Sequence, residues 1–312
     1  MSSLQPKILV IKHGALGDIV QGLDAFANLR QLHADAKICL LTTKAFTSFF
    51  ENCPWFDEIY TDPRASAWRL DAHMKMRGLF RRGWDSVIDL QCSQRSRRYH
   101  QLFFKSMPGR WFGDAPNCSH PIPDFSGVNN RDRMLHTASM TGANKIDAIS
   151  AASMDWLLAQ SQFNLPAENY CVLIPGCSAA KPSKRWMSKG FVELAKLAIA
   201  DGIQPVLVGT SVDKEAIDEV QLSVPEAINL IGQTGFADLV KLSAASRFVV
   251  GNDTGPVFLA ARSAAPTIMV MGNDTDPSMS APVGPKATYL RAKSISDIDA
   301  KSVFDAFKTL ER

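Results

Sequence analysis

The sequence of 312 residues lacks the marks of several protein classes. Its six cysteines form no Cys-x-x-Cys pair and its six histidines show no zinc-ligand spacing, so neither a disulfide framework nor a structural zinc site is indicated. Its apolar runs, such as 8–11 and 268–271, are far shorter than the ~20 residues that a membrane span needs. Residues 1–7 contain no apolar signal core. These absences predict a cytoplasmic protein with free thiols.

Two familiar nucleotide-binding glycine motifs are also missing. The first candidate strand, over 8–11, leads into Gly14-Ala15-Leu16-Gly17-Asp18, where the glycine spacing is GxxG rather than GxGxxG. No acidic residue closes the second strand, over 37–43, so the dinucleotide fingerprint is not met and a hydride-transferring dehydrogenase is disfavoured. The turn also lacks the Lys-Ser/Thr ending of a P-loop, which argues against an ATPase or kinase.

Positive charge is concentrated in one part of the chain. Residues 69–110, the basic segment, contain ten lysines or arginines and three aspartates. This segment therefore carries +7 and leaves −4 for the rest of the chain, within a total of +3. Such a face can attract phosphate-bearing lipid, nucleic acid or an anionic sugar, or it can be a merely solvated helix face. No nucleic-acid motif accompanies it, so nucleic acid is not an expected partner.

Short apolar runs of β type alternate with helical stretches in two series. The first series has strands over 8–11, 38–41 and 87–90 and helices over 19–32, 46–50 and 69–82. The second has strands over 171–174, 206–208, 228–231, 248–250 and 268–270 and helices over 188–200, 213–222 and 236–245. This alternation predicts α/β architecture, with two doubly wound, Rossmann-like domains of parallel sheet facing a cleft.

The domain limits follow from composition. Residues 164–169 are the best linker candidate, which places an N-terminal domain at 1–163 and a C-terminal domain at 168–296. Residues 297–312 form a terminal helix that could pack back on the N-terminal domain. The stretch 109–128 is rich in proline, glycine, serine and asparagine and predicts a loop.

The stretch 248–272 is the most informative of the chain, because it contains a buried strand, a polar glycine turn, a helix and a second strand. The turn Gly251-Asn252-Asp253-Thr254-Gly255-Pro256 places a helix start at 254–256. Unpaired backbone N–H groups and the helix dipole favour an anion there, Gly255 allows close approach, and Pro256 suits the first helical turn. The alternative is an ordinary capped turn.

Taken together, these motifs resemble glycosyltransferase family 9, the lipopolysaccharide heptosyltransferases. The resemblance covers nearly the whole chain, in register. It is carried by Gly14 to Asp18, Ile88-Asp89-Leu90-Gln91, Pro175-Gly176, Lys184-Arg185-Trp186, Phe191, Val208-Gly209 with Asp213, Gly232-Gln233-Thr234, Gly251 to Pro256 and Thr275-Asp276-Pro277.

The resemblance implies a GT-B fold and an inverting, metal-independent transfer of heptose. The donor would be ADP-heptose, held mainly by the C-terminal domain, and the acceptor an anionic glycolipid or oligosaccharide of the lipopolysaccharide core, held by the N-terminal domain. The basic segment would touch the cytoplasmic face of the inner membrane. Two alternatives stay open: a family member with another nucleotide sugar or acceptor, and a catalytically silent nucleotide-binding protein.

The resemblance also implies roles for individual residues. Asp18 would be the catalytic base, with His13 as its rival, and Lys184 would neutralise the departing diphosphate. Asp213, with Glu215 nearby as a competitor, would bind the ribose. The remaining residues expected to bind the donor are Gly17, Gly176, Ser178, Arg185, Thr234, Asp253, Thr254, Gly255 and Pro256.

Two features bear on metal and on donor identity. Asp274-Thr275-Asp276 has the DxD spacing that can hold Mg²⁺ or Mn²⁺, although its flanks look like this family's metal-free loop. Where the family commonly has histidine after the Thr-Gly-Pro turn, this chain has Phe258, and Asn273-Asp274 replaces the usual loop residues. Donor contacts are therefore expected to differ there.

Overall fold

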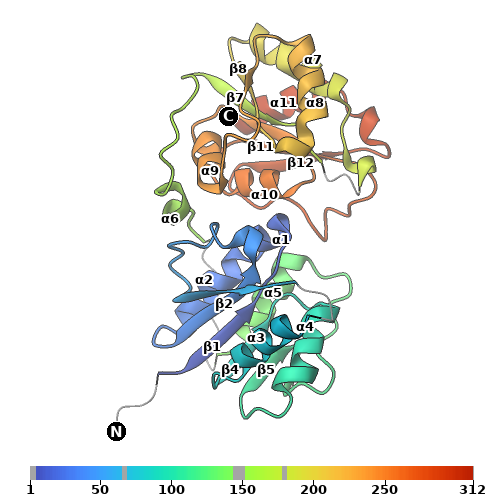
Figure 1. The fold of residues 1–312 in the computed structure, drawn as a ribbon. Helices are drawn as coiled ribbons and strands as arrows, with labels where there is room; N and C mark the ends of the chain where they lie inside the picture. Colours follow the sequence, from blue (N-terminus) through green and yellow to red (C-terminus); the bar gives the residue numbers. More distant parts are fainter. Residues whose placement is uncertain (1–4, 65–68, 143–151, 178–180, 312) are drawn as a thin grey trace. The chain divides into compact units, whose positions relative to one another are not determined.

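The computed structural model describes residues 5–64, 69–142, 152–177 and 181–311. The chain divides into two compact units, Met1–Ser153 and Met154–Arg312, which Figure 1 draws in blue to green and in yellow-green to red. Within the described residues, each unit is built on one six-stranded sheet whose neighbouring strands are all parallel. The predicted α/β class with two doubly wound, Rossmann-like domains is confirmed.

The sheet of the first unit has the order β3-β2-β1-β4-β5-β6. Its strands are β1 (Lys7–Ile11), β2 (Lys37–Thr43), β3 (Glu58–Asp62), β4 (Ser86–Asp89), β5 (Arg110–Gly113) and β6 (His120–Pro121). Its helices are α1 (Leu16–Gln21), α2 (Leu23–Leu32), α3 (Leu70–Phe80), α4 (Gln94–Tyr99) and α5 (Asn130–Ser139), with short helical turns η1 (Lys44–Phe46) and η2 (His100–Phe104). Strand β1 pairs Ile8 with Ile38 on one side and with Ser86 on the other, so it lies at the centre.

Alternation along the strands divides the core of the first unit between two faces. Leu9, Ile11 and Val87 pack on one face against Phe80 of α3 and Phe104 of η2. The intervening residues, such as Val10 and Leu40, are fully buried as well, since both faces of a parallel sheet are covered. Helices α1, α2 and α5 pack against one another.

The second sheet has the order β12-β11-β10-β7-β8-β9. Its strands are β7 (Tyr170–Ile174), β8 (Gln204–Leu207), β9 (Ile228–Asn229), β10 (Val249–Asn252), β11 (Thr267–Met271) and β12 (Ala287–Arg291). Its helices are α6 (Asp155–Leu158), α7 (Ser188–Ala200), α8 (Lys214–Ser223), α9 (Phe236–Ala244), α10 (Gly255–Ala261) and α11 (Ala300–Glu311), with turns η3 (Pro182–Lys184), η4 (Ser211–Asp213) and η5 (Ile295–Asp297). One face is covered by α7, α8 and α11, and α9 and α10 pack together beside β10 and β11.

Several expectations about elements need correction. The stretch 109–128 contains strands β5 and β6, because the apolar pair Trp111-Phe112 is buried in the sheet. The helix expected over 19–32 is divided at Gly22 into α1 and α2. The helix expected over 46–50 is a short 3-10 turn, and the fully buried Phe50 stacks edge-on with Phe26.

The division between the units also differs from the predicted limits. The boundary lies between Ser153 and Met154, ahead of the predicted linker, because α6 packs on α9 and Ser161 Oγ donates to Asp238 Oδ1 at 2.7 Å. The terminal helix α11 packs on α7 and β11 and so belongs to the core of the second unit. Its Phe307 is fully buried and stacks on Phe248 with ring centroids 4.3 Å apart.

Candidate functional site

The two sheets reverse their strand order at the same place. Strand β1 lies between β2 and β4, and β7 lies between β8 and β10. In open parallel sheets, ligands bind outside the carboxyl ends of the strands at such a reversal. The loops after β1 and β4, and those after β7 and β10, are therefore the candidate sites.

Asp18 lies in the first turn of α1, just beyond the end of β1. Its half-buried carboxylate accepts two hydrogen bonds: Oδ2 from the backbone N–H of Ala15 at 3.2 Å, and Oδ1 from Nδ2 of Asn130 at 3.1 Å. The first donor is local. The second comes from α5, 112 residues away in the sequence.

Lys12 follows β1 directly and is 1% exposed. Burial lowers the pKa of Lys12 to about 8, against the opposing attraction of the Asp18 carboxylate, and the Arg133 guanidinium lowers it further. A carboxylate and two cations thus meet at the end of the central strand.

His13 is enclosed. Its Nε2 lies 3.0 Å from Asp62 Oδ2, and both side chains are 1% exposed. Burial opposes ionisation of Asp62, but His13 and a 2.6 Å hydrogen bond from the Tyr99 hydroxyl overcome it and bring the pKa of Asp62 to about 2. The enclosure of its imidazole makes His13 a poorer candidate than Asp18 to receive a proton from a bound substrate.

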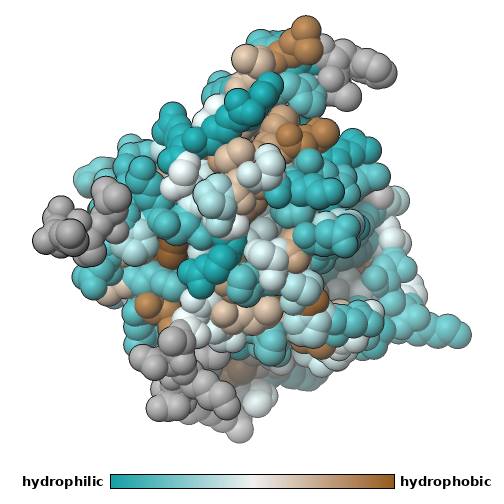
Figure 2. All heavy atoms as spheres, turned by 90° about the horizontal axis from the view of Figure 1, so that it is seen from below, coloured by the Kyte–Doolittle hydropathy of each residue, from teal (hydrophilic) through white to brown (hydrophobic). Residues whose placement is uncertain are grey.

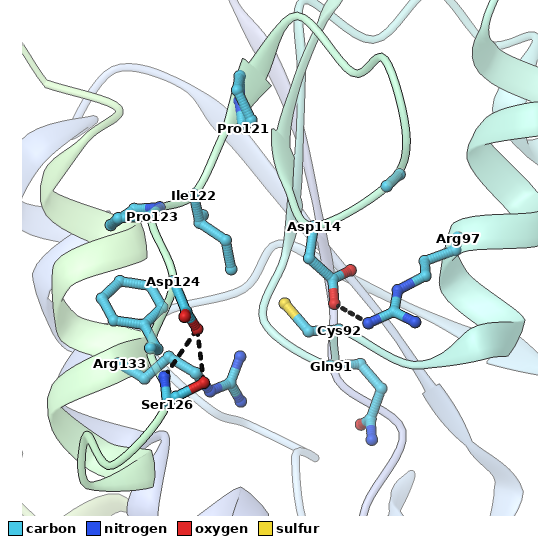
Figure 3. Close-up of a pocket in the computed structure, with 12 residues that line it drawn as sticks. Gln91, Cys92, Arg97, Asp114, Pro121, Ile122, Pro123, Asp124, Ser126 and Arg133 are labelled. Carbon is cyan, nitrogen blue, oxygen red and sulfur yellow. Dashed lines mark hydrogen bonds and ion pairs between the residues drawn. The ribbon is translucent and has the colours of Figure 1, made fainter.

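A cavity of about 660 Å³ opens beside these residues in the first unit. Figure 3 shows the residues that line it. Arg97 donates to Asp114 Oδ2 at 2.5 Å, and Ser126 donates to Asp124 through its hydroxyl at 2.7 Å and its backbone N–H at 2.9 Å. Arg133 extends from α5 into the space between Ser126 and Gln91. The cavity is thus polar and offers arginine donors.

Behind the cavity, Asp89 at the end of β4 is completely buried, and this burial raises its pKa to about 6. Its Oδ1 accepts from the backbone N–H groups of Gln91 at 3.1 Å and Cys92 at 2.9 Å. Asp89, Cys92 and Asp114 place one potential metal-ligand atom each within 4.8 Å of the others. Arg97 is the ion-pair partner of Asp114 in this group.

In the second unit, Asn252 fixes the loops around the strand-order reversal. Its Nδ2 donates to the carbonyl oxygens of Pro175 at 2.9 Å and Gly176 at 3.2 Å, and its Oδ1 accepts from the backbone N–H of Trp186 at 2.8 Å. The side chain is fully buried at the end of β10. One amide therefore connects the loop after β7 to the segment that carries Lys184.

Asp253 follows Asn252 and contacts two polar side chains of this site. Its Oδ2 pairs with Nζ of Lys184 and accepts from the Thr275 hydroxyl at 2.5 Å. The Lys184 side chain is 16% exposed and that of Asp253 is 6% exposed. Lys184 is therefore held in one place, with part of its side chain still accessible.

Gly176 and Asp213 lie against each other. A Cβ at Gly176 would collide with the Asp213 carboxylate, so a larger residue would displace that carboxylate. Asp213 Oδ2 accepts from the backbone N–H and the hydroxyl of Thr210 at 2.9 and 2.8 Å. Arg185, next to Lys184, has a buried Nε without a hydrogen-bond partner.

The predicted helix start after β10 is confirmed: Thr254 is the N-cap of α10, and Gly255-Pro256 form its first turn. Gly17 lies within α1, and Thr234 lies half-buried in the loop before α9. Ser178 is outside the described residues. In the DxD segment, Thr275 is buried against Asp253, whereas Asp274 and Asp276 are exposed and Asp276 caps its own turn through Ser278.

Two groups of predicted residues are thus brought together by the fold: Lys184 with Asp253, and Gly176 with Asp213. Four residues with prominent contacts at these sites were not predicted: Lys12, Asn130, Arg133 and Asn252. Asn252 lay within the recognised glycine turn, and Lys12 directly after an apolar strand, so both carried a sequence signal. Asn130 and Arg133 lie on α5, a helix that the pattern of apolar residues did not indicate.

Comparisons with known proteins agree with this geometry. Residues 115–307 match the pattern of Glycosyltransferase family 9 (heptosyltransferase). The lipooligosaccharide heptosyltransferase 2 of Haemophilus ducreyi is 25% identical over 311 residues, which cover 91% of this chain and 88% of that protein. Heptosyltransferase relatives from Haemophilus influenzae, Salmonella typhimurium and Escherichia coli are 32 to 34% identical, but the aligned segments span only 36 to 39% of their length.

Solved structures share the fold. Escherichia coli ADP-heptose lipopolysaccharide heptosyltransferase II superposes with a TM-score of 0.78, at 22% identity, over 98% of both chains. The Escherichia coli heptosyltransferase WaaC with ADP-2-deoxy-2-fluoro heptose gives 0.76, at 19% identity, over 97% of this chain and 99% of that one. The two Rossmann-like units and these superpositions therefore define a GT-B fold. The chain belongs to glycosyltransferase family 9, the heptosyltransferases.

Proposed function

We propose that this glycosyltransferase moves heptose from ADP-heptose to an acceptor in the lipopolysaccharide core, with inversion at the anomeric carbon and without a metal ion. The observation that carries the proposal is the Lys184–Asp253 pair at the strand-order reversal of the second unit, in a chain of this family. The similarity to a lipooligosaccharide heptosyltransferase, and the ADP-heptose analogue in one similar solved structure, support the choice of donor and acceptor class.

The second unit would hold the donor. Lys184 would neutralise the diphosphate as the bond to the sugar breaks, because a cation fixed in advance stabilises charge that develops in the transition state. Asp253 keeps Lys184 in place. Thr254, Gly255 and Pro256 at the start of α10 would approach the phosphates, with Arg185 and Gly176 beside them, and Asp213 would bind the ribose.

The first unit would bind the acceptor and supply the catalytic base. The acceptor hydroxyl attacks the anomeric carbon from the side opposite ADP, its proton passes to the Asp18 carboxylate, and ADP leaves with the electrons of the broken bond. A carboxylate at a helix start is a weak base, so it would take the proton late, as the attacking hydroxyl becomes acidic.

The same groups support the proposal of metal independence. The two cations Lys184 and Arg185 would offset the leaving-group charge in place of a divalent ion. The DxD aspartates are exposed, and Asp276 accepts from Ser278. Transfer should continue undiminished in excess EDTA, and its loss, with recovery on adding Mg²⁺ or Mn²⁺, would contradict this part of the proposal.

The alternatives concern donor identity and activity. Phe258 is 4% exposed within α10, so it belongs to the core and supplies no hydrogen bond to a ligand. The decisive experiment is a panel of ADP-, UDP- and GDP-sugars tested for protection against thermal unfolding, followed by transfer to a truncated core of the Kdo-lipid A type. We expect stabilisation by ADP-heptose and product formation. Stabilisation without product would indicate a silent binding protein, and no stabilisation by any sugar would contradict the donor site.

The basic segment would contact the membrane surface that carries the acceptor. Leu70 and Met74 of α3 and Leu102 of η2 are 77, 65 and 62% exposed, and α3 contacts η2. The same segment carries exposed cations, which are Lys75, Arg77, Arg81, Arg82, Arg98 and Lys105. In the described part of the chain, no helix combines the length and apolar character needed to cross a bilayer.

Cations with a few apolar side chains suit peripheral binding to anionic lipid. Figure 2 shows one face of the molecule, where hydrophilic residues cover most of the described surface and hydrophobic residues form small groups. The triple change Leu70→Ser, Met74→Ser, Leu102→Ser should weaken cosedimentation with vesicles containing phosphatidylglycerol. If this variant bound such vesicles as well as wild type does, or if wild type bound neutral vesicles equally well, this surface would be excluded as the membrane-binding site.

A further inference from the structure

Asn130 lies in the first turn of α5 and has no part in the family motifs. Its Nδ2 donates to Asp18 Oδ1 at 3.1 Å, across 112 residues of sequence. Together with the backbone N–H of Ala15 on Oδ2, it gives each oxygen of the Asp18 carboxylate one donor. The orientation of this carboxylate therefore depends on α5 as well as on its own helix.

The direction of the Asn130 amide is fixed by its other neighbour. Arg133 Nη2 donates to Asn130 Oδ1 at 2.9 Å and to the carbonyl of Leu90 at 3.2 Å. A guanidinium only donates hydrogen bonds and a carboxylate only accepts them. The amide oxygen must therefore face Arg133 and the amide nitrogen must face Asp18, since the flipped amide would lose both bonds.

Arg133 also belongs to the cavity. Its side chain is among those that line it, and its buried Nη1 has no hydrogen-bond partner among the residues that the structure describes. Figure 3 shows the guanidinium between Ser126 and Gln91. Among the other lining groups, Asp114 pairs with Arg97 and Asp124 accepts from Ser126. An acceptor oxygen that carries negative charge would satisfy the open donor of Arg133.

We propose that Asn130 is a positioning residue: it aligns the Asp18 carboxylate through an amide that Arg133 holds, so that anion binding in the cavity and alignment of the base are coupled. The inference rests on the proposed role of Asp18 as base. It also implies that the acceptor carries a carboxylate or phosphate group close to the hydroxyl that reacts, and that Nη1 of Arg133 donates a hydrogen bond to this group.

The test compares Asn130→Ala with Asn130→Asp, using ADP-heptose and a truncated core of the Kdo-lipid A type. Both residues suit the first turn of a helix, alanine by propensity and aspartate by the helix dipole, so both variants should fold. Ser139→Ala, an exposed position at the other end of α5, is the matched control. Misalignment of a catalytic group is costly, so we expect kcat of Asn130→Ala to fall about tenfold with an unchanged KM for ADP-heptose.

The aspartate variant separates positioning from mere structure. A second carboxylate beside Asp18 removes the donor to Oδ1 and also repels the ionised form of Asp18, so kcat should fall further than in Asn130→Ala, and the acidic limb of the pH profile should move to higher pH. Lys12 and Arg133, the cations facing Asp18, are the same in both variants. Equal losses of kcat with parallel pH profiles would overturn the positioning role.

Arg133→Lys tests the coupling. It should raise the KM for the acceptor and lower kcat in the wild-type background, and it should leave kcat unchanged in the Asn130→Ala background. Independent effects of the two changes on kcat would contradict the coupling. The failure of this inference is distinct from failure of the proposed function: wild-type kcat in both Asn130 variants overturns only the inference, whereas wild-type turnover in Asp18→Asn removes the proposed base itself.

Discussion

In both units a side-chain amide links the loops that follow two neighbouring central strands. The more accessible charged side chain near these loops is negative in the first unit and positive in the second. In the first, the Gln91 side chain after β4 accepts from the backbone N–H of His13 after β1, at 2.8 Å. In the second, Asn252 at the end of β10 donates to the carbonyl oxygens after β7. These strands occupy equivalent places in the two sheets. An amide thus closes the strand-order reversal in each unit.

The charges differ at this shared position. The first unit buries its cation, Lys12, and leaves the Asp18 carboxylate half-buried between two neutral donors. The second unit places its carboxylate, Asp253, against Thr275 and leaves the cation Lys184 the more accessible member of the pair. One scaffold can therefore offer a proton acceptor in one unit and an anion-binding group in the other, which are the two functions that transfer from an activated sugar requires.

The largest effect on activity is expected when the half-buried carboxylate of the first unit, Asp18, is removed. Asp18→Asn keeps the shape and one hydrogen-bond acceptor but cannot take a proton at neutral pH. We expect kcat to fall about 100-fold or more, the scale of a lost general base, while ADP-heptose protects the variant as well as wild type against thermal unfolding. Turnover near the wild-type value would show that the carboxylate at this position is only a helix cap.

Removing Lys184, the accessible cation of the second unit, should have a somewhat smaller effect on activity. Lys184→Ala takes away the charge proposed to neutralise the donor phosphates and leaves Asp253 without its ion-pair partner. We expect kcat/KM for the donor to fall about 50-fold and ADP binding to weaken, measured by calorimetry. Lys181→Ala, an exposed lysine three residues earlier, is the control and should behave as wild type. Equal losses in both variants would indicate a general charge effect.

The two amides can be compared through stability. Asn252→Ala removes three hydrogen bonds of a fully buried side chain, so we expect a loss of about 2–3 kcal/mol in the free energy of unfolding. Gln91→Ala removes one bond of a half-buried side chain and should cost about 1 kcal/mol. Urea denaturation measures both. A larger loss for Gln91→Ala would show that the two closures are not equivalent.

The buried cation should be visible in the pH dependence of stability. The pKa of Lys12 is lowered from 10.5 to about 8, so between these values the unfolded chain binds more protons than the folded one. The free energy of unfolding should rise with pH across this window, by at most about 1.4 kcal/mol per pH unit from this residue. In Lys12→Met this contribution disappears. Urea denaturation at pH 7.5 and 9.5 compares the slopes, and parallel slopes would contradict a buried, destabilised ammonium group.

Sequence patterns predicted the centre of each sheet better than its edges. The strands around Ile8, Val87, Leu173 and Val250 are continuous apolar runs, because both faces of a central parallel strand are buried. The edge strands β3, β6 and β12, which were not predicted, are short or only partly buried, so periodicity carries less signal there. The fourth edge strand, β9, was predicted over 228–231. Strand β5 was hidden because its two buried aromatics stand in a stretch rich in turn-forming residues.

The candidate sites show a similar division. Asp18, Lys184, Asp253 and Thr254 stand in short motifs next to strands, where local sequence is enough to find them. The contact from Asn130 to Asp18 spans 112 residues and depends on how α5 packs against α1 and α2. No local sequence pattern encodes a contact between residues so far apart in the chain, so the hydrogen bond from Asn130 to Asp18 could be found only in the structure.

The boundary between Ser153 and Met154 has a consequence for how such proteins diversify. Each unit has its own sheet and its own core, and the terminal helix completes the core of the second unit alone. The 660 Å³ cavity is lined by residues of the first unit, whereas β7 and β10 belong to the core of the second. On the proposed division of acceptor and donor between the units, natural selection can alter the recognised glycan in one half of the gene while the nucleotide preference encoded in the other half stays as it was.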